Sequence, residues 1–216
     1  EDLPKIDLIF AGSPCQGFSS NGKHTGLEHK QSRLFWEFIR LLRALKPKHF
    51  LLENVSMKQE WRDIISKEVG CEPLKINSSL VSAQSRPRLY WTNIPGVTVP
   101  EDKGLTIFDI LEFPAAPVQP MVTRARKSYC LTATHGNCLG KDGLPIPSEI
   151  IHNTKRHQRT CIIHDDHWRM LSPVECERLQ TVPDGYTSSV TQRQRYRCLG
   201  NGWTVDVIAH LLSFKL

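Results

Sequence analysis

Residues 6–15 read IDLIFAGSPC, an apolar run that passes directly into a segment containing glycine and proline. The first five residues predict a buried strand, and the residues from Ala11 onward predict a turn or loop. A helix is expected at about residues 32–45, where apolar side chains recur at helical spacing before Pro47. The apolar run HFLL at residues 49–52 predicts a second strand. Strand, helix and strand in this order are typical of an α/β sheet.

The same alternation continues to residue 92 and then stops. We expect a helix around residues 61–69, strands at 74–77 and 89–92, and further helices from Ser172 onward, where SPVE predicts a capped start, at about 189–199 and at the end of the chain. Residues 97–169 hold five of the nine histidines and break the pattern. The expected organisation is therefore an α/β core over residues 1–96, a small irregular or β lobe over 97–169, and helices over 170–216 that return to the core.

Composition narrows the class of protein. The 216 residues include 28 Lys and Arg against 22 Asp and Glu, a net charge of +6 that is compatible with a polyanionic partner. No apolar run approaches the ~18 residues of a membrane span, and the first residues do not resemble a signal peptide. The seven cysteines show no framework spacing and predict reduced thiols. An intracellular protein without membrane association is expected.

Two side chains follow the predicted strands at the edge of the sheet where α/β proteins bind ligands. Cys15 lies in the loop after the first strand, where backbone N–H groups can lower the pKa of a thiol and make it a nucleophile. Glu53 ends the second strand, where partial desolvation can raise the pKa of a carboxyl and make it an acid. The alternatives are a small core thiol and a solvated carboxylate.

Two further segments could bind a ligand. Arg86 and Arg88, in QSRPR at residues 84–88, point to the same side of an extended chain and could hold a phosphate and a base carbonyl together. The alternative is an exposed basic edge strand. In GNGW at residues 200–203, glycines allow close approach to a ligand, and the helix that follows offers free N–H groups. The alternative is an ordinary turn that joins two helices.

Five segments taken together resemble the family of C5-cytosine DNA methyltransferases, in the family's own order and spacing. They are AGSPCQGFS at residues 11–19, ENV at 53–55, QSRPR at 84–88, the ninth motif at Leu171–Pro183 and the start of the tenth at Gly200. The segments 26–35 and 90–96 resemble the de novo subgroup, which has a short target-recognition lobe. The resemblance implies a Rossmann-like fold of S-adenosylmethionine-dependent methyltransferases and places the recognition lobe at 97–169.

The resemblance also implies roles for individual residues. Cys15 would attack C6 of a cytosine flipped out of duplex DNA, Glu53 would contact N3, and Arg88 would hold O2 with support from Arg86. The resemblance implies that S-adenosylmethionine is the cofactor and ends as S-adenosylhomocysteine. The residues expected beside the cofactor are Pro14, Asn201, Gly202 and Trp203, and those expected to contact DNA are Gln16, Ser19, Arg124, Arg126 and Lys127.

One departure from the family concerns the cofactor site. The aromatic-x-Gly-x-Gly loop and the acidic residue that open the family's fold do not occur here, which predicts a fold without its first strands. The missing part is expected on a second polypeptide or on a longer chain, or the chain is a degenerate copy. We expect this chain alone to bind S-adenosylmethionine poorly.

Alternatives to a DNA methyltransferase stay open at this point. One is an RNA (tRNA) methyltransferase with the same chemistry, and another is a non-catalytic partner of an active enzyme. A structural zinc is also conceivable, but the spacings match no strong zinc motif, so no metal is expected. The residues considered for zinc are Cys130, His135, Cys138, Cys161, His164 and His167.

Overall fold

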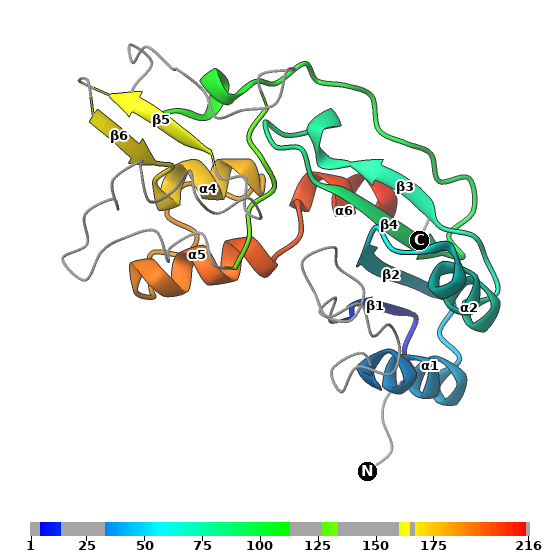
Figure 1. The fold of residues 1–216 in the computed structure, drawn as a ribbon. Coiled ribbons are helices and arrows are strands. Elements are labelled where there is room, and N and C mark those ends of the chain that lie inside the picture. Colours follow the sequence, from blue (N-terminus) through cyan, green and yellow to red (C-terminus); the bar gives the residue numbers. More distant parts are fainter. Residues whose placement is uncertain (1–4, 14–32, 113–126, 134–159, 165–166, 215–216) are drawn as a thin grey trace. The chain divides into compact units, whose positions relative to one another are not determined.

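The computed structural model describes residues 5–13, 33–112, 127–133, 160–164 and 167–214 (Figure 1). The chain divides into two compact units. The first consists of Glu1–Ile76, Pro87–Val99 and His210–Leu216, and the second of Asn77–Arg86 and Pro100–Ala209. This division differs from the expected three parts, because most of the residues after 170 share a unit with residues 100–169.

The first unit contains a four-stranded sheet in the order β1-β2-β4-β3, apart from the last residue of β3. The strands are β1 (Leu8–Gly12), β2 (His49–Val55), β3 (Leu74–Asn77) and β4 (Pro87–Thr92). β1 runs parallel to β2, with Gly12 opposite Glu53, whereas β4 runs antiparallel to β2, with Arg88 opposite Val55. The sheet is therefore mixed, within the α/β class that the sequence predicts.

Two helices, α1 (Arg33–Leu45) and α2 (Gln59–Val69), pack against one face of this sheet (Figure 1). Gly70 follows the last residue of α2, and its left-handed φ of 79° lets its N–H bond to the carbonyl of Ser66. Alternate residues of β2 and β4 face the helices, as the two-residue period of a strand requires. The core residues are Phe35, Phe38, Ile39, Phe50, Leu52, Ile65, Leu89 and Trp91.

The second unit has its own apolar core. Its elements are η2 (Ser78–Leu80), η3 (Ile107–Ile110), the antiparallel hairpin of β5 (Cys161–His164) and β6 (His167–Met170), α4 (Pro173–Leu179), α5 (Gln192–Asn201) and the first part of α6 (Val205–Leu212). The core residues are Ala83, Ile107, Ile110, Leu111, Leu131, Leu171, Cys176, Leu179, Tyr196 and Leu199.

Local sequence signals place most of the helix starts. The predicted capping box at α4 is confirmed, since the Ser172 hydroxyl accepts from the Glu175 N–H at 3.1 Å and the Glu175 carboxylate accepts from the Ser172 N–H at 2.8 Å. The start expected for α5 at residue 189 is wrong by three residues, because Thr191 caps that helix. In the part of the chain that the structure describes, no helix has the length and apolar character needed to cross a membrane.

Candidate active site

Glu53 and Arg88 lie side by side on the sheet. Glu53 is near the end of β2, which extends two residues further to Val55. Arg88 in β4 is opposite Val55, and the diagonal position brings it to the same side of the sheet as Glu53. Its Nε lies 2.9 Å from the carboxylate Oε1, and the two side chains are only 13% and 11% exposed.

This ion pair combines opposite charges in a largely dehydrated place, where electrostatic interactions are stronger than in water. The Arg88 Nη1 also donates to the carbonyl of Pro87 at 2.9 Å, which fixes the plane of the guanidinium. The carboxyl and the guanidinium thus form a preorganised pair of polar groups. Two of the residues that the sequence predicted for the site are therefore brought together by strand register.

Asn54 connects this pair to the loop that carries Cys15. The Asn54 side chain is 1% exposed, donates from Nδ2 to the Ser13 hydroxyl at 2.7 Å, and accepts from the Val55 N–H at 2.8 Å. Ser13 is the last described residue before Cys15 in the sequence. The family resemblance includes Asn54 in ENV at residues 53–55 but implies no role for it. The signal for such a role is its position next to Glu53 at the end of an apolar run.

Arg86 is buried in the second unit, with 4% of its surface exposed. Its Nη1 donates to the Leu131 carbonyl at 2.9 Å and lies 3.2 Å from the Cys130 sulfur. Its Nη2 donates to the carbonyls of Gly200 at 3.2 Å and Gly202 at 2.9 Å. The guanidinium therefore ties together two segments that are about seventy residues apart in the sequence.

These bonds contradict the expectation that Arg86 and Arg88 hold one ligand together. The expectation assumed that both residues lie in one strand, where alternate side chains share a face. β4 begins only at Pro87, so Arg86 lies outside the strand, and the rule of alternating side chains does not apply to it. Arg86 is a structural residue of the second unit, and Arg88 alone remains a candidate for contact with a base.

Gln180 is a second buried residue that organises the turn after α5. Its amide nitrogen donates to the carbonyls of Leu199 and Gly202, and its amide oxygen accepts from Gln84 Nε2 and from the Thr204 hydroxyl, both at 3.0 Å. All four hydrogen-bonding positions of the amide are thus used within the protein. The sequence placed Gln180 in the ninth motif without a role, and its burial is visible only in the structure.

The turn at residues 200–203 presents a restricted set of groups. Asn201 is exposed, and Gly202 and Trp203 are half-buried. The N–H groups of Val205 and Asp206, at the start of α6, already bond to the Gln180 carbonyl at 3.0 Å and the Thr181 hydroxyl at 2.8 Å. The expectation that this helix offers those N–H groups to a ligand is therefore wrong.

Gly200 is held so closely that no side chain fits. A Cβ at this position would lie 2.2 Å from the carbonyl carbon of Thr132 and 2.4 Å from the N of Ala133. In an ordinary helix Gly→Ala is stabilising, but here we expect Gly200→Ala to destabilise the protein by about 1–3 kcal/mol. Urea unfolding measures the change, with Gly202→Ala as the control because its nearest contact would be 3.1 Å. Equal stability of Gly200→Ala and the wild-type protein would contradict this packing.

Lys127 is not placed to contact DNA. Its side chain is buried, with 7% exposure, and its Nζ donates to the carbonyls of Ser79 at 2.7 Å and Ser82 at 3.2 Å. Burial lowers the pKa of this ammonium from its ordinary value. The expected role in DNA binding is therefore wrong for Lys127, whose charge serves to join backbone segments.

Several predicted site residues lie outside the described residues. They are Pro14, Cys15, Gln16, Ser19, Arg124 and Arg126. Of the six side chains considered for zinc, only that of Cys130 is described, half-buried beside Arg86. Within the ranges that the structure covers, no three His, Cys, Asp or Glu side chains are grouped as a metal site would require.

Comparisons with known proteins give a consistent result. The family model described as C-5 cytosine-specific DNA methylase matches residues 1–67 and 82–213. The type II methyltransferase M.HpaII of Haemophilus parainfluenzae is 27% identical, over 94% of this chain and 70% of that enzyme. M.HhaI of Haemophilus parahaemolyticus is 25% identical, over 97% of this chain and 75% of that enzyme.

Solved structures show the same fold. The Entamoeba histolytica methyltransferase EhMeth superposes with a TM-score of 0.64 at 18% identity, over 96% of this chain and 76% of that one. A mutant of DNMT2 from Spodoptera frugiperda gives a TM-score of 0.60 at 20% identity, over 97% of this chain and 79% of that one.

Proposed function

Because this chain belongs to the C-5 cytosine-specific DNA methylase family, whose members use S-adenosylmethionine to methylate cytosine at C5, we propose that its substrate is cytosine in duplex DNA. The observation that carries this proposal is the partly buried pair of Glu53 and Arg88. The type II names of M.HpaII and M.HhaI support a role in restriction–modification. An intracellular location is part of the same proposal, because the substrate is DNA.

The Glu53–Arg88 pair matches one edge of a cytosine. That edge carries an acceptor at O2, an acceptor at N3 and a donor at N4, and it becomes accessible when the base leaves the helical stack. A guanidinium next to a carboxyl can donate to O2 while the carboxyl contacts N3 and N4. A protonated Glu53 would donate to N3 and so limit the negative charge that develops on the ring.

Cys15 is the proposed nucleophile. Its thiolate forms a bond to C6, and the electrons of the C5–C6 double bond move toward N3, where the proton from Glu53 neutralises them. The enamine that results makes C5 nucleophilic, and C5 would form its bond to the methyl group as the bond between that group and the cofactor sulfur breaks, which leaves S-adenosylhomocysteine. A base would then remove the C5 proton, N3 would return its proton to the Glu53 carboxylate, the C5–C6 double bond would re-form, and the thiolate of Cys15 would leave from C6.

The turn at residues 200–203 is the part of the described chain that we expect to contact the cofactor. When bound, S-adenosylmethionine supplies the electrophilic methyl group. The exposed amide of Asn201 can form hydrogen bonds, and the half-buried Trp203 offers an aromatic surface suited to a nucleobase. Gln180 and Arg86 both bond to the Gly202 carbonyl and so hold this turn in place.

A second polypeptide that completes the cofactor site is part of the proposal. In the described sheet β1 is an outer strand, and its residue Phe10 is 48% exposed. An outer strand presents backbone groups on which a further strand can pair. A calorimetric titration of S-adenosylmethionine into this chain alone tests the idea, and tight stoichiometric binding would contradict it.

Membership of the de novo subgroup stays a prediction.

The test of the substrate is a comparison of labelled methyl transfer from S-adenosylmethionine to mixed-sequence duplex DNA and to tRNA. We expect label in the DNA, at C5 of cytosine, and a loss of labelling with Cys15→Ser. The tRNA arm is needed because the sequence leaves open an RNA (tRNA) methyltransferase with the same chemistry. The likeness to DNMT2 does not decide between the two substrates, because it concerns the fold alone. Transfer to tRNA without transfer to DNA would overturn the proposed substrate while leaving the chemistry in place.

Replacement of Glu53 by glutamine tests the role of its carboxyl. Glutamine keeps the size of the side chain but supplies neither the proton nor the negative charge that Arg88 contacts. We expect kcat to fall by about 10²–10⁴-fold, the usual contribution of a general acid. The control is Glu37→Gln, which removes an exposed carboxylate paired with Arg40 on α1. Equal rates for the two variants would exclude Glu53 from the reaction.

A further inference from the structure

Helix α5 differs from the other long helices in its charges. Its sequence QRQRYRCLGN contains three arginines and no acidic residue. On α1 and α2, by contrast, acidic side chains occur among the basic ones, and the arginines at positions 40 and 43 both form ion pairs, with Glu37 and Glu68. The charge of α5 is therefore not balanced along the helix itself.

The middle arginine of α5 has a structural partner. Arg195 Nη2 lies 2.9 Å from the carboxylate of Glu177, and its Nε donates to the Thr187 hydroxyl at 2.9 Å. Glu177 is fully buried and also accepts from the N–H groups of Gly185 at 2.7 Å and Thr187 at 2.8 Å. Burial raises the pKa of Glu177, but these hydrogen bonds outweigh it and hold the pKa below its ordinary value. Arg195 is thus committed to a buried carboxylate.

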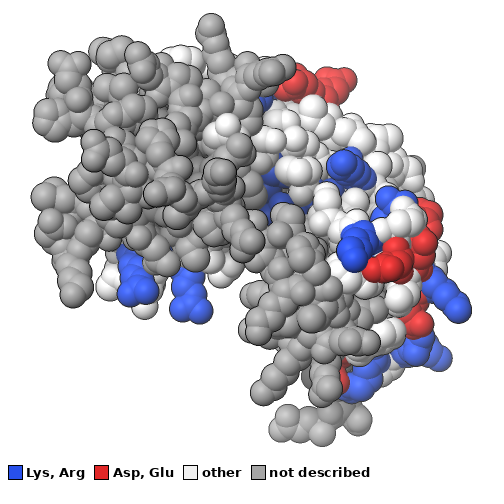
Figure 2. Space-filling view, viewed as in Figure 1, with Lys and Arg blue, Asp and Glu red and all other residues white. Residues whose placement is uncertain are grey.

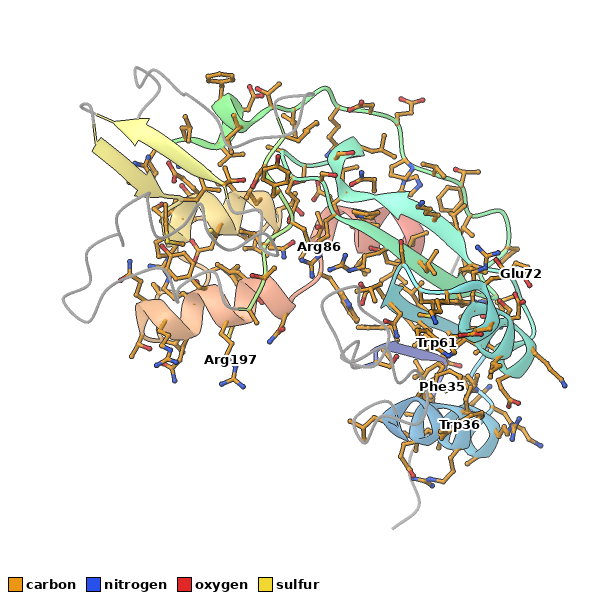
Figure 3. The ribbon with its side chains drawn as sticks, in the orientation of Figure 1. Phe35, Trp36, Trp61, Glu72, Arg86 and Arg197 are labelled. Atoms are coloured by element: carbon orange, nitrogen blue, oxygen red, sulfur yellow. The ribbon has the colours of Figure 1, made fainter. Side chains whose placement is uncertain are left out.

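The two flanking arginines have no such partner. Arg193 and Arg197 are exposed, and four residues apart they lie on one face of the helix. Among the residues that the structure describes, neither forms an ion pair with a carboxylate. In Figure 3 the side chain of Arg197 points away from the helix, and Figure 2 shows basic side chains that project in the same region.

The position of Arg193 is unfavourable for the helix alone. It lies in the first turn of α5, where the helix dipole favours anions, and that turn contains no acidic residue. The helix is nevertheless firmly held, because Tyr196 is buried with its hydroxyl bonded to the Leu171 carbonyl at 2.9 Å, and Leu199 is in the core. A rigid helix therefore presents two positive charges that stabilise neither the helix nor a neighbouring carboxylate.

We propose that Arg193 and Arg197 bind neighbouring phosphates of the duplex DNA backbone, outside the flipped base. Cβ atoms four residues apart are about 5–6 Å from each other, which allows two guanidinium groups to reach successive phosphates of one strand. The exposed Gln192 and Gln194 add hydrogen-bond donors beside them. Such contacts position a protein on DNA without reading its sequence. The inference rests on the proposed DNA substrate.

The test is the salt dependence of binding to a labelled duplex, for the whole chain and for Arg193→Gln/Arg197→Gln. Each phosphate contact contributes about 0.9 to the slope of log K against log salt, so the double variant is expected to lose about 1.8. A rise from about 50 to 200 mM salt should then weaken wild-type binding about twelvefold more than it weakens variant binding. The decrease in this slope should be the same on duplexes of different sequence.

The matched control is Arg40→Gln/Arg43→Gln, which removes the same charge from exposed arginines of α1. Its slope should equal that of the wild-type protein, and Arg193→Lys/Arg197→Lys should retain most of the slope. Thermal unfolding of each variant confirms that the fold is intact. An unchanged slope in Arg193→Gln/Arg197→Gln, an equal loss in the control, or no measurable duplex binding by the wild-type protein would overturn the inference.

Methyl transfer by the wild-type protein, measured on the same duplex and on tRNA, separates this inference from the proposed function. A lower slope for Arg193→Gln/Arg197→Gln together with transfer to tRNA alone would keep the phosphate contact and reject DNA as the methylated substrate. Transfer to the duplex together with an unchanged slope would reject the phosphate contact and keep the proposed function.

Discussion

Replacing Cys15 with serine should lower the rate of methyl transfer by on the order of 10³-fold or more. A hydroxyl ionises far less readily than a thiol, so the variant supplies almost no nucleophile at neutral pH. Cys176 cannot take over, because burial raises the pKa of its thiol well above its ordinary value. The measurement is the initial rate of labelled transfer with both substrates in excess.

A covalent trap tests the same step independently of turnover. When fluorine replaces the C5 proton of the target cytosine, no base can remove it after methyl transfer, so Cys15 stays bonded to C6. We expect a protein–DNA adduct that survives denaturing electrophoresis for the wild-type protein and none for Cys15→Ser. The control is Cys198→Ser, which changes an exposed thiol and should behave as wild type. Unchanged methylation by Cys15→Ser would favour a non-catalytic partner.

Local signals in the sequence predicted the helices and strands well. The capping box at Ser172 and the apolar spacing before Pro47 depend only on neighbouring residues, and both appear in the structure. The start of α5 was misplaced because Thr191, not Ser189, provides the capping hydroxyl. The antiparallel course of β4 could not be predicted, because strand direction depends on how distant segments pair.

The candidate site depends even more on contacts between segments that are distant in the sequence. Glu53 and Arg88 could each be selected from the sequence, but their contact depends on the register between β2 and β4. The spacing of Arg86 and Arg88 predicts a shared ligand, and the place of Lys127 in the expected recognition lobe predicts contact with DNA. Arg86 and Lys127 are both buried and bonded to carbonyl groups of distant segments, and no local pattern distinguishes such a residue from one that binds a phosphate or a base.

Arg86 therefore gives the prediction with the largest expected effect on stability. Four groups depend on its guanidinium: the sulfur of Cys130 and the carbonyls of Leu131, Gly200 and Gly202. Replacement by methionine keeps an apolar stem of similar length but removes all four of these interactions, and the Gly202 carbonyl keeps only its bond from Gln180 at 3.3 Å. We expect Arg86→Met to lower the free energy of unfolding by about 3–5 kcal/mol. Urea unfolding of the whole chain measures it.

Arg88→Met is the matched variant, because it removes the neighbouring arginine of the same motif. Arg88 contacts the Glu53 carboxyl and one carbonyl, so its loss should affect stability less and methyl transfer more. The two variants then separate structure from chemistry: Arg86→Met unfolds at lower urea, whereas Arg88→Met stays folded with a much lower rate. The opposite result is an Arg86→Met protein that is as stable as the wild type and has the rate defect expected of Arg88→Met. That result would contradict the structural role of Arg86 and indicate that it contacts the reacting base.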